Sequence, residues 1–466
     1  MRAALLCLCL IPVFPAFAGG EAPTLVGVAR VSASAVDRQG ETLGGFGSGM
    51  MIVPGSWKVA GKGYAAKLFM LPDRGWNTAG TTDYRARLQS FDMTLMPDAG
   101  SPGTEGQLQL NYKDTLLLTD PAGAPTTGYD PAGVRAGQGG TPDLPVAANG
   151  HVSLDNEAVA SDGKGGFWVS DEYGPYIYRF DATGRMTGAI RPPDAFIPMR
   201  AGRENFSSSN PPADVMYDNG DPASGRQNNQ GFEGTSVSPD GRILFVINQS
   251  ALRQDLDTVA VKKTRRNVRL LAYDITGTPR LIHEYAVQLP VFQDEDGRTI
   301  VAAQSELLAI DDHRLLLLCR DSGGGFASKR STSLYRKIEL IDTRGATDVS
   351  GKYDDMTGSI APKGVLRDGI MPVTMRDFID LNDNAQLNRF GLHNGDPADS
   401  HDLYEKWESL ALGPTGKPGE YILLVGSDND FITQHGHMAG RDYKDAALAE
   451  VDTLVLAWRV SLPADR

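Results

Sequence analysis

Five stretches of the chain repeat one pattern of apolar and polar positions. Four copies begin at a glutamate, run through a short apolar strand and a turn with Asp or Gly, and enter a second apolar strand. These copies start at Glu157, Glu233, Glu306 and Glu408, and a degenerate copy without the acidic residue begins near Gly47. Because repetition of one short unit is typical of repeat architectures, each copy is interpreted as one structural unit.

Several copies contain a third strand that ends in an acidic residue, at 177–181, 270–274 and 338–342. Strands at short spacing with turn residues between them predict an all-β protein. The interval between successive glutamates leaves room for four strands and long loops, which matches a blade of a β-propeller. We therefore predict a β-propeller of five or six four-stranded blades. The long interval from Glu306 to Glu408 holds either the sixth blade or insertions.

The two ends of the chain each contain a predicted strand, at 24–31 and 453–460. Either strand alone would be an exposed sheet edge, so we expect the two to pair and close the ring of blades. Three segments rich in Gly, Pro, Asp and Asn interrupt the repeats, near 97–150, 191–231 and 351–404. We interpret them as loop insertions within one domain that covers residues 19–466. Residues 374–381 are predicted to form a short helix.

The N-terminus has the pattern of a secretory signal peptide. Arg2 precedes an apolar run from 3 to 14, and small residues then lead to a cleavage site after Ala18. We therefore predict a periplasmic or secreted protein with a signal peptide at 1–18. No later stretch reaches the roughly 20 apolar residues of a membrane span. The formal charge of −13 argues against nucleic-acid binding.

Cleavage after Ala18 would leave Cys319 as the remaining cysteine. Its place in an apolar strand favours an inert core thiol over a nucleophile.

The repeat predicts a ring of carboxylates. The first strand of each blade lines the channel of a propeller, so Glu157, Glu233, Glu306 and Glu408 should meet around the axis. Crowded carboxylates raise one another's pKa or require a cation. Calcium binds six to eight oxygens in a flexible shell, which makes these four glutamates candidate metal ligands. The alternative is that they cap turns or bridge neighbouring blades.

The second strands end in a further tier of polar residues. Its carboxylates are candidate catalytic groups: Asp73, Asp171, Glu172 and Asp428. Arg74 and Arg320 in the same tier present planar, permanently charged groups that suit phosphate or carboxylate oxygens. A site with both elements would bind a small anionic ester and cleave it with a metal-activated water.

Three other motifs contain residues that could carry chemistry. His435 and His437 lie in one loop, where they would either share a metal or stay solvated. The basic run 262–266 is either a solvated hairpin tip or an anion-attracting rim. Ser48 lacks the Gly-x-Ser-x-Gly spacing of a nucleophile elbow, so a serine esterase mechanism is not supported.

Four phrases of the sequence resemble the phytase-like domain family, also called esterase-like activity of phytase: 152–157, 167–177, 229–234 and 427–431. The resemblance implies an exported β-propeller with phosphoester or carboxyl-ester hydrolase activity and dependence on calcium. It assigns the four glutamates to the family's repeated glutamate. It also assigns Asp73-Arg74-Gly75 to an early family motif, and Asp171-Glu172 and 428–430 to rim acids.

The chain departs from the family pattern at two places. Glu408 is followed by Ser409 where the family has Gly, and Cys319 precedes Arg320 where the family has Glu. The second change removes a carboxylate from any metal site that uses it. The leading hypothesis is an exported, calcium-dependent phosphoester hydrolase. A non-catalytic propeller that binds a ligand or partner protein, and a lactonase-like sugar-ester hydrolase, are the alternatives.

Overall fold

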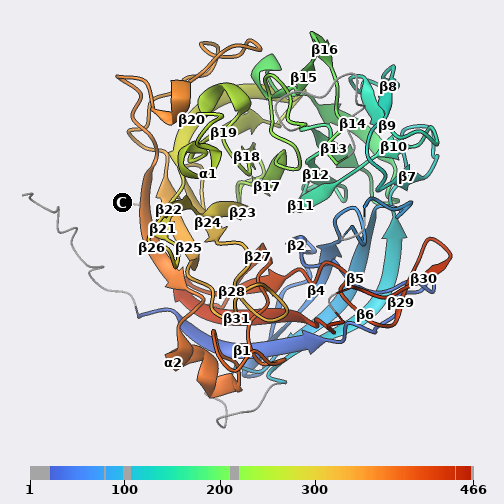
Figure 1. The fold of residues 1–466 in the computed structure, drawn as a ribbon. Coiled ribbons are helices and arrows are strands. Elements are labelled where there is room, and N and C mark those ends of the chain that lie inside the picture. Colours follow the sequence, from blue (N-terminus) through green and yellow to red (C-terminus); the bar gives the residue numbers. More distant parts are fainter. Residues whose placement is uncertain (1–20, 78–79, 98–105, 210–219, 447, 463–466) are drawn as a thin grey trace, which may run out of the picture.

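The computed structural model describes residues 21–77, 80–97, 106–209, 220–446 and 448–462. The predicted signal peptide, residues 1–18, lies outside these ranges. Within them the chain is built mainly of β-strands, and the helices are short (Figure 1). The prediction of an all-β protein is therefore confirmed.

Four sheets are each formed by consecutive antiparallel strands of one repeat. The first contains β2 (Gly49–Ile52), β4 (Gly63–Leu71), β5 (Arg87–Leu95) and β6 (Leu108–Leu117), with the short β3 (Lys58–Ala60) beside β4. The second contains β11 (Asn156–Ser161), β12 (Phe167–Asp171), β13 (Ile177–Phe180) and β14 (Met186–Ile190). The third contains β17 (Phe232–Val237), β18 (Ile243–Asn248), β19 (Asn267–Asp274) and β20 (Arg280–Gln288). The fourth contains β23 (Ala303–Ala309), β24 (Arg314–Arg320), β25 (Arg336–Asp342) and β26 (Thr374–Asp380).

The fifth sheet joins the two ends of the chain. Its order is β27 (Trp407–Pro414), β28 (Glu420–Ser427), β31 (Thr453–Ser461) and β1 (Thr24–Val31). β1 runs antiparallel to β31, from the pair Thr24 and Arg459 to the pair Val31 and Thr453. The predicted pairing of the terminal strands is therefore confirmed.

The five sheets surround a common centre (Figure 1). Each innermost strand contacts the next in cyclic order, from β2 through β11, β17, β23 and β27 back to β2. Five large apolar clusters fill the spaces between neighbouring sheets. In one of them Leu316 of the fourth sheet shares the core with Trp458 of the fifth. The core is thus divided into layers, each shared by two sheets.

Three details of the prediction need correction or refinement. The helix predicted at 374–381 is wrong, because β26 occupies this segment and pairs with β25. As an outer strand with one solvated face, it carries a short amphipathic pattern that suits either a strand or a helix. The interval from Glu306 to Glu408 contains no sixth sheet of this kind. The segment near 97–150 includes β6, which belongs to the first sheet.

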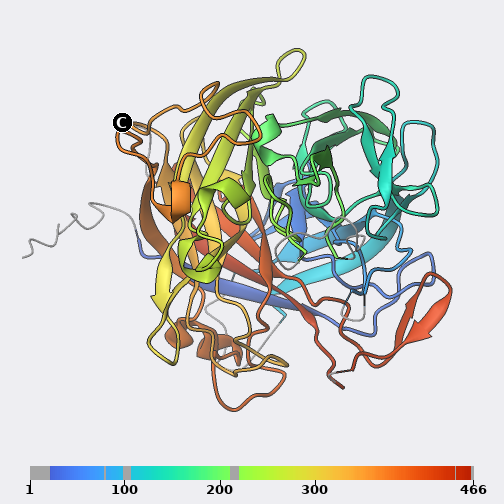
Figure 2. The same ribbon diagram turned by 45° about the horizontal axis from the view of Figure 1, so that its top comes forward.

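The remaining elements lie in the connections between the sheets. A small sheet contains β7 (Thr126–Thr127), β10 (Val152–Ser153), β9 (Leu144–Val146) and β8 (Gly133–Arg135). Three two-stranded sheets are β15 (Met199–Arg200) with β16 (Arg203–Glu204), β21 (Val291–Gln293) with β22 (Thr299–Val301), and β29 (Gly436–Met438) with β30 (Arg441–Tyr443). The hairpin β29–β30 projects at the periphery, beside the first sheet (Figure 2).

The helical elements are single turns. The 3-10 turns are η1 (Asp194–Phe196), η3 (Arg253–Asp255), η4 (Pro362–Gly364) and η5 (Asn388–Phe390), and the α-helical turns are α1 (Val261–Thr264) and α2 (Asn384–Leu387). The basic run 262–266 therefore begins in a helical turn rather than at a hairpin tip. None of the helices in the described ranges combines the length and hydropathy needed to cross a bilayer.

Strand β1, which pairs with β31, should contribute strongly to stability. Leu25 is fully buried between the fourth and fifth sheets, so Leu25→Ala is expected to lower the free energy of unfolding by about 2–5 kcal/mol. Val36 is 57% exposed, and Val36→Ala is the matched control with a change below about 0.5 kcal/mol. Urea unfolding followed by tryptophan fluorescence measures both. Equal effects of the two substitutions would contradict a stabilising role for β1.

Candidate active site

Two rows of polar side chains meet at one rim of the sheets. Because neighbouring strands are antiparallel, each first strand begins where its second strand ends. Asn156 pairs with Asp171, Phe232 with Asn248, and Trp407 with Ser427. The repeat glutamates therefore lie beside the polar ends of the second strands, as the two predicted tiers require.

Three of the glutamates occupy the same irregularity of the first strand. The pairing register shifts within 156–159, 232–235 and 407–409. These intervals contain Glu157, Glu233 and Glu408. A β-bulge bends a strand and redirects a side chain, and bulges are common beside functional sites. One local device thus sets the direction of three carboxylates.

Glu306 does not share this position. In the fourth sheet the skipped residue is Ser305, so Glu306 lies one residue further along the strand. A shift of one residue turns a strand side chain to the other face. The Glu306 carboxylate accepts the N–H of Leu307 at 2.7 Å and lines a mainly apolar cavity of about 540 Å³. Glu306 therefore differs from the other three glutamates in its position on the strand.

The inner strands approach one another closely at this level. A Cβ atom at Gly234 would lie 2.6 Å from the backbone nitrogen of Leu307. A side chain at position 234 would therefore force the third and fourth sheets apart. Ser305 fills the place of the missing glutamate, and its hydroxyl accepts the Nε–H of Arg320 at 3.1 Å.

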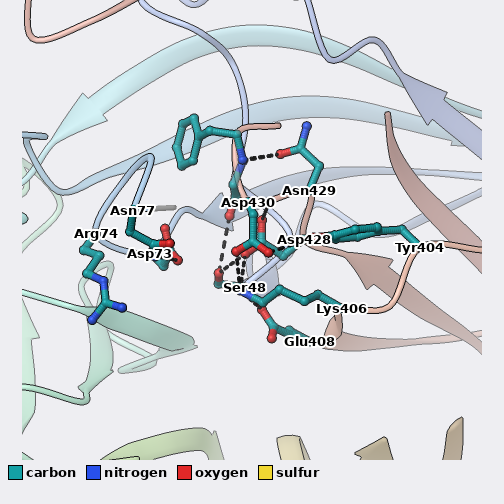
Figure 3. A network of polar contacts seen from close by, with 12 residues as sticks. Ser48, Asp73, Arg74, Asn77, Tyr404, Lys406, Glu408, Asp428, Asn429 and Asp430 are labelled. Atoms are coloured by element: carbon teal, nitrogen blue, oxygen red, sulfur yellow. Dashed lines mark hydrogen bonds and ion pairs between the residues drawn. The ribbon is translucent and has the colours of Figure 1, made fainter. Parts of the chain in front are cut away.

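A half-buried lysine compensates the carboxylates of the fifth sheet (Figure 3). Lys406 Nζ lies 2.8 Å from Asp430, 3.0 Å from Asp428 and 3.3 Å from Glu408. Burial opposes the charge of Lys406, yet Asp428 and then Asp430 raise its pKa well above the usual value. Burial acts against the charge of Asp430 as well, but Lys406 holds the pKa of Asp430 below its usual range. Lys406 is therefore a permanent internal cation.

The two arginines of the predicted substrate site are also paired with acids. Arg320 lies 2.5 Å from Glu408, and Arg74 lies 2.5 Å from Asp155. Arg74 also donates to the side chain of Asn229. Burial disfavours the charge of Arg74, but Asp155 raises the pKa of Arg74 well above its usual value.

The candidate catalytic acids differ in how fully they are engaged. Asp171 accepts the N–H groups of Gly174 at 2.9 Å and Asp155 at 2.8 Å, one on each oxygen. Asp73 accepts the N–H of Gly75 at 3.0 Å. Glu172 accepts the N–H of Gly231 at 3.1 Å, on one oxygen. Asp171 thus serves the local turn, while Glu172 has a second oxygen free of such a bond.

Burial dominates the protonation of the site. It raises the pKa values of Asp73, Asp171, Glu157 and Glu233 well above their usual values, and neighbouring acids add to this effect.

Burial also raises the pKa of Glu172 and that of Asp428 to about 7. For Glu172 the charge of Asp155 acts in the same direction.

Two groups of acids in the described ranges are close enough to share a cation. In each group the carboxylate oxygens lie within 4.8 Å of one another. One group is Asp73, Asp428 and Asp430, and the other is Asp155, Glu157 and Glu172. Lys406 already supplies positive charge to the first group.

The second group lies beside carboxylate atoms without partners. Burial raises the pKa of Glu157, and the charges of Glu233 and Asp155 raise it further. Within the described ranges, Glu233 Oε2 is buried without a partner. Glu233 Oε1 accepts the side-chain N–H of Gln249 at 2.8 Å. Oxygen ligands and uncompensated charge of this kind fit a hard divalent cation.

Asp155 and Lys406 were not among the predicted site residues. Asp155 lies two positions before Glu157, and Lys406 lies two positions before Glu408. Comparison of this position between the repeats is the signal in the sequence that could have pointed to both residues. A position that is acidic in one copy and basic in another carries no shared chemistry. Only the spatial neighbours reveal that both residues face the site.

The remaining candidate residues named from the sequence lie in different surroundings. Ser48 is buried and donates to Asp428 at 3.3 Å, which gives it a partner but no histidine base. His437 lies 2.7 Å from Asp442, and His435 is 3.9 Å from Glu450. The two histidines belong to none of the acid and histidine groups found in the described ranges. Cys319 is fully buried, as expected of a core thiol.

The sequence matches the model of the Phytase-like family, esterase-like activity of phytase, over residues 64–431. The match covers most of the chain, including both strand tiers that form the site. The chain belongs to this family.

A curated relative from Arthroderma benhamiae is 44% identical over 450 residues, which cover 88% of this chain and 87% of that protein. It is named an uncharacterized secreted protein. Solved structures with partial similarity include a putative 6-phosphogluconolactonase from Bacteroides uniformis, at 11% identity and a TM-score of 0.28, with 92% of this chain and 98% of that chain covered. Another is an N-acetylgalactosamine deacetylase from F. plautii, at 8% identity and a TM-score of 0.34, with 95% of each chain covered.

Lys406→Met should destabilise the protein at neutral pH. Removal of one partner from a buried charge network typically costs about 3–5 kcal/mol, because the remaining charges are uncompensated. The loss in unfolding free energy should shrink at pH 5, where Asp428 can take up a proton. Lys417→Met is the control, since Lys417 is 76% exposed beside Glu420 and should change stability by less than about 1 kcal/mol. A Lys406→Met variant as stable as the control would contradict the compensating role.

The protein freed of divalent cations should lose stability as the pH rises from 5 to 8. The folded-state pKa of Glu172 and of Asp428 is about 7, above that of an unfolded carboxylate. Protonation therefore favours the folded state, and this contribution disappears as the pH passes through about 7. Chemical unfolding in a chelating buffer measures the trend, and Glu172→Gln should flatten it. A stability that rises over this range would argue against the raised pKa values.

Proposed function

We propose that the chain is an exported hydrolase that requires a divalent cation, most simply calcium, and cleaves a small anionic ester such as a phosphoester. Membership of the Phytase-like family supports hydrolysis. The N-terminal signal-peptide pattern and the name of the secreted relative support a periplasmic or secreted location. The observation that carries the proposal is the pair Glu157 and Glu233, whose carboxylates are buried among other acids and are offset in part by Arg320 at Glu233.

The fold that would present this site is a five-bladed β-propeller closed by β1 and β31. The cyclic contacts of the innermost strands and the five apolar layers between the sheets support closure. In such a fold the first strands line the axis, so residues from all the repeats reach one channel. A single site then combines carboxylates from one pair of blades with positively charged side chains from other blades.

Three carboxylates are suited to hold the cation: Asp155, Glu157 and Glu233. A bound divalent cation would supply positive charge for the anionic ester and lower the pKa of a water molecule. Glu306 and Asp428 are left out of this set, because Glu306 is held by Leu307 and Asp428 by Lys406.

The remaining residues divide the work of binding and proton transfer. Arg74 and Arg320 would exchange part of their contact with Asp155 and Glu408 for the oxygens of the ester. Glu172 has a pKa of about 7, which suits a general base at neutral pH. Lys406 keeps Asp428 and Asp430 in place next to Asp73. The engagement of Asp171 by two backbone groups favours a positioning role over a direct one.

Calcium binding tests the assignment of the ligands. Calorimetric titration of the chelator-treated protein with calcium chloride should give binding that Glu157→Gln or Glu233→Gln abolishes, because each substitution removes a charged ligand. Glu306→Gln is the matched control and should retain the affinity of the native chain. Loss of binding in the control alone, or unchanged binding in Glu233→Gln, would refute the ligand assignment.

Turnover tests the reaction. With calcium present, phytate, bis(4-nitrophenyl) phosphate and 4-nitrophenyl acetate separate phosphomonoesterase, phosphodiesterase and carboxylesterase activity. Arg74→Met should lower kcat/KM on the preferred substrate about 10²–10³-fold, the usual effect of losing one preorganised group that stabilises developing charge. Absence of turnover on all three substrates, together with absence of stabilisation by calcium, would favour a binding module over an enzyme.

A further inference from the structure

A cleft with aromatic walls opens near the acidic site, and the proposed hydrolysis does not use it. The cavity has a volume of about 300 Å³ and is lined by Trp76, Asp83, Tyr129, Arg441 and Tyr443 among others. A second hollow of about 590 Å³ shares Thr81 and Tyr129 with it. The two hollows together offer room for a ligand larger than a single ester group.

The aromatic walls are held in fixed orientations. The rings of Trp76 and Tyr443 stack with centroids 4.4 Å apart and planes inclined by 17°. The Tyr443 hydroxyl donates to the carbonyl of Phe431 at 2.9 Å, and the Trp76 indole N–H donates to Asp445 at 3.4 Å. Tyr129 remains 37% exposed. Rigid, partly exposed rings of this kind are suited to bind a flat apolar surface at low entropic cost.

One wall of the cleft is continuous with the acidic site. Trp76 follows Asp73 and Arg74 in a single tight turn, in which the N–H of Gly75 donates to Asp73 at 3.0 Å. Gly75 has φ +92°, and a Cβ atom there would lie 2.6 Å from Cβ of Tyr84. Only glycine fits this turn, so the positions of Asp73 and Trp76 are coupled.

The opposite wall is tied to the same arginine. A Cβ atom at Gly128 would lie 2.1 Å from the carbonyl oxygen of Arg74. The Tyr173 hydroxyl donates to the carbonyl of Gly128 at 2.9 Å, and the Arg74 guanidinium lies 5.7 Å from the centre of the Tyr173 ring. Tyr129 therefore stands at a fixed place next to Arg74. A ligand seated between Trp76 and Tyr129 would point one end toward the acidic site.

The polar rim of the two hollows selects against a highly charged ligand. It carries the carboxylates of Asp83, Asp130 and Asp442 and a single guanidinium, Arg441. Excess negative charge disfavours a polyphosphate. Neutral groups with hydroxyls are accepted, because carboxylate, amide and guanidinium groups can all form hydrogen bonds with them.

We propose that this cleft binds a neutral sugar ring. The apolar C–H face of such a ring stacks on aromatic side chains, and its hydroxyls bond to the polar rim. The inference rests on the proposed function, because it names the part of the ester that does not react. The substrate is then a sugar that carries one ester group, held by the cleft while the ester reaches Arg74, rather than a ring substituted with phosphate at every position.

Saturation-transfer NMR on the full mature chain in chelating buffer tests sugar binding without catalysis. The probes are methyl α-glucopyranoside, methyl β-galactopyranoside, N-acetylglucosamine, cellobiose and maltose. At least one should receive saturation at its ring protons. Trp76→Ala and Tyr129→Ala should each weaken binding about tenfold or more, the size of a lost aromatic contact. If Trp76→Ala does not fold, Tyr129→Ala still measures the aromatic contribution to sugar binding, because Tyr129 is the more exposed residue and its loss should leave the fold intact.

Trp57→Ala is the matched control. Trp57 stacks on Tyr64 with ring centroids 5.5 Å apart, is half-buried like Trp76, and is not part of the cleft. Binding should be unchanged in this variant.

Absence of saturation for every saccharide, or equal binding by the native chain and Tyr129→Ala, overturns the proposal. Neither result depends on calcium or turnover, so hydrolysis of a simple ester without sugar binding would reject the cleft alone. Sugar binding without any hydrolysis would reject the proposed reaction and retain the cleft.

Discussion

Repulsion among buried carboxylates at the centre of the molecule is the constraint on which the rest of the site depends. Circular arrangement of the repeats brings acids from distant parts of the chain together, away from water, where their charges are costly. Positively charged side chains nearby offset part of this cost. Lys406 compensates the acids of the fifth sheet, Arg320 pairs with Glu408, and Arg74 pairs with Asp155. Glu157 faces mainly other acids, whereas Arg320 offsets part of the charge of Glu233.

This uneven compensation divides one acidic centre into two parts with different chemistry. Where a lysine is built in, a metal ion has less to gain, although Asp428, with a pKa of about 7, still takes up a proton near neutrality. Where side chains supply little positive charge, the carboxylates must be protonated or must bind a cation from solution. The same fold thereby holds an ion network around Lys406 and a group of acids around Glu157, and the two adjoin, since the charge of Asp155 raises the pKa of Asp73.

The architecture could be predicted from the sequence more fully than the site. The repeated strand pattern and the unpaired ends at 24–31 and 453–460 led to the all-β fold and to the pairing of β1 with β31. The sequence does not show that Glu306 lies one residue beyond the bulge position of the other glutamates, because alignment of the repeats cannot locate a bulge. A shift of one residue decides which way a strand side chain points. Lys406 was missed because its importance lies in neighbours that come from other strands. The sequence pattern of residues 374–381 predicts a helix, because a strand this short with one solvated face has too few residues to distinguish the period of a strand from that of a helix.

The sheet that pairs β1 with β31 has a consequence for the order of folding events. The strands of the other four sheets all lie between β1 and β31 in the sequence. Until β31 has been made, β1 cannot be paired and the fifth sheet cannot form. The fifth sheet is therefore completed only after every strand of the other four sheets has been synthesised.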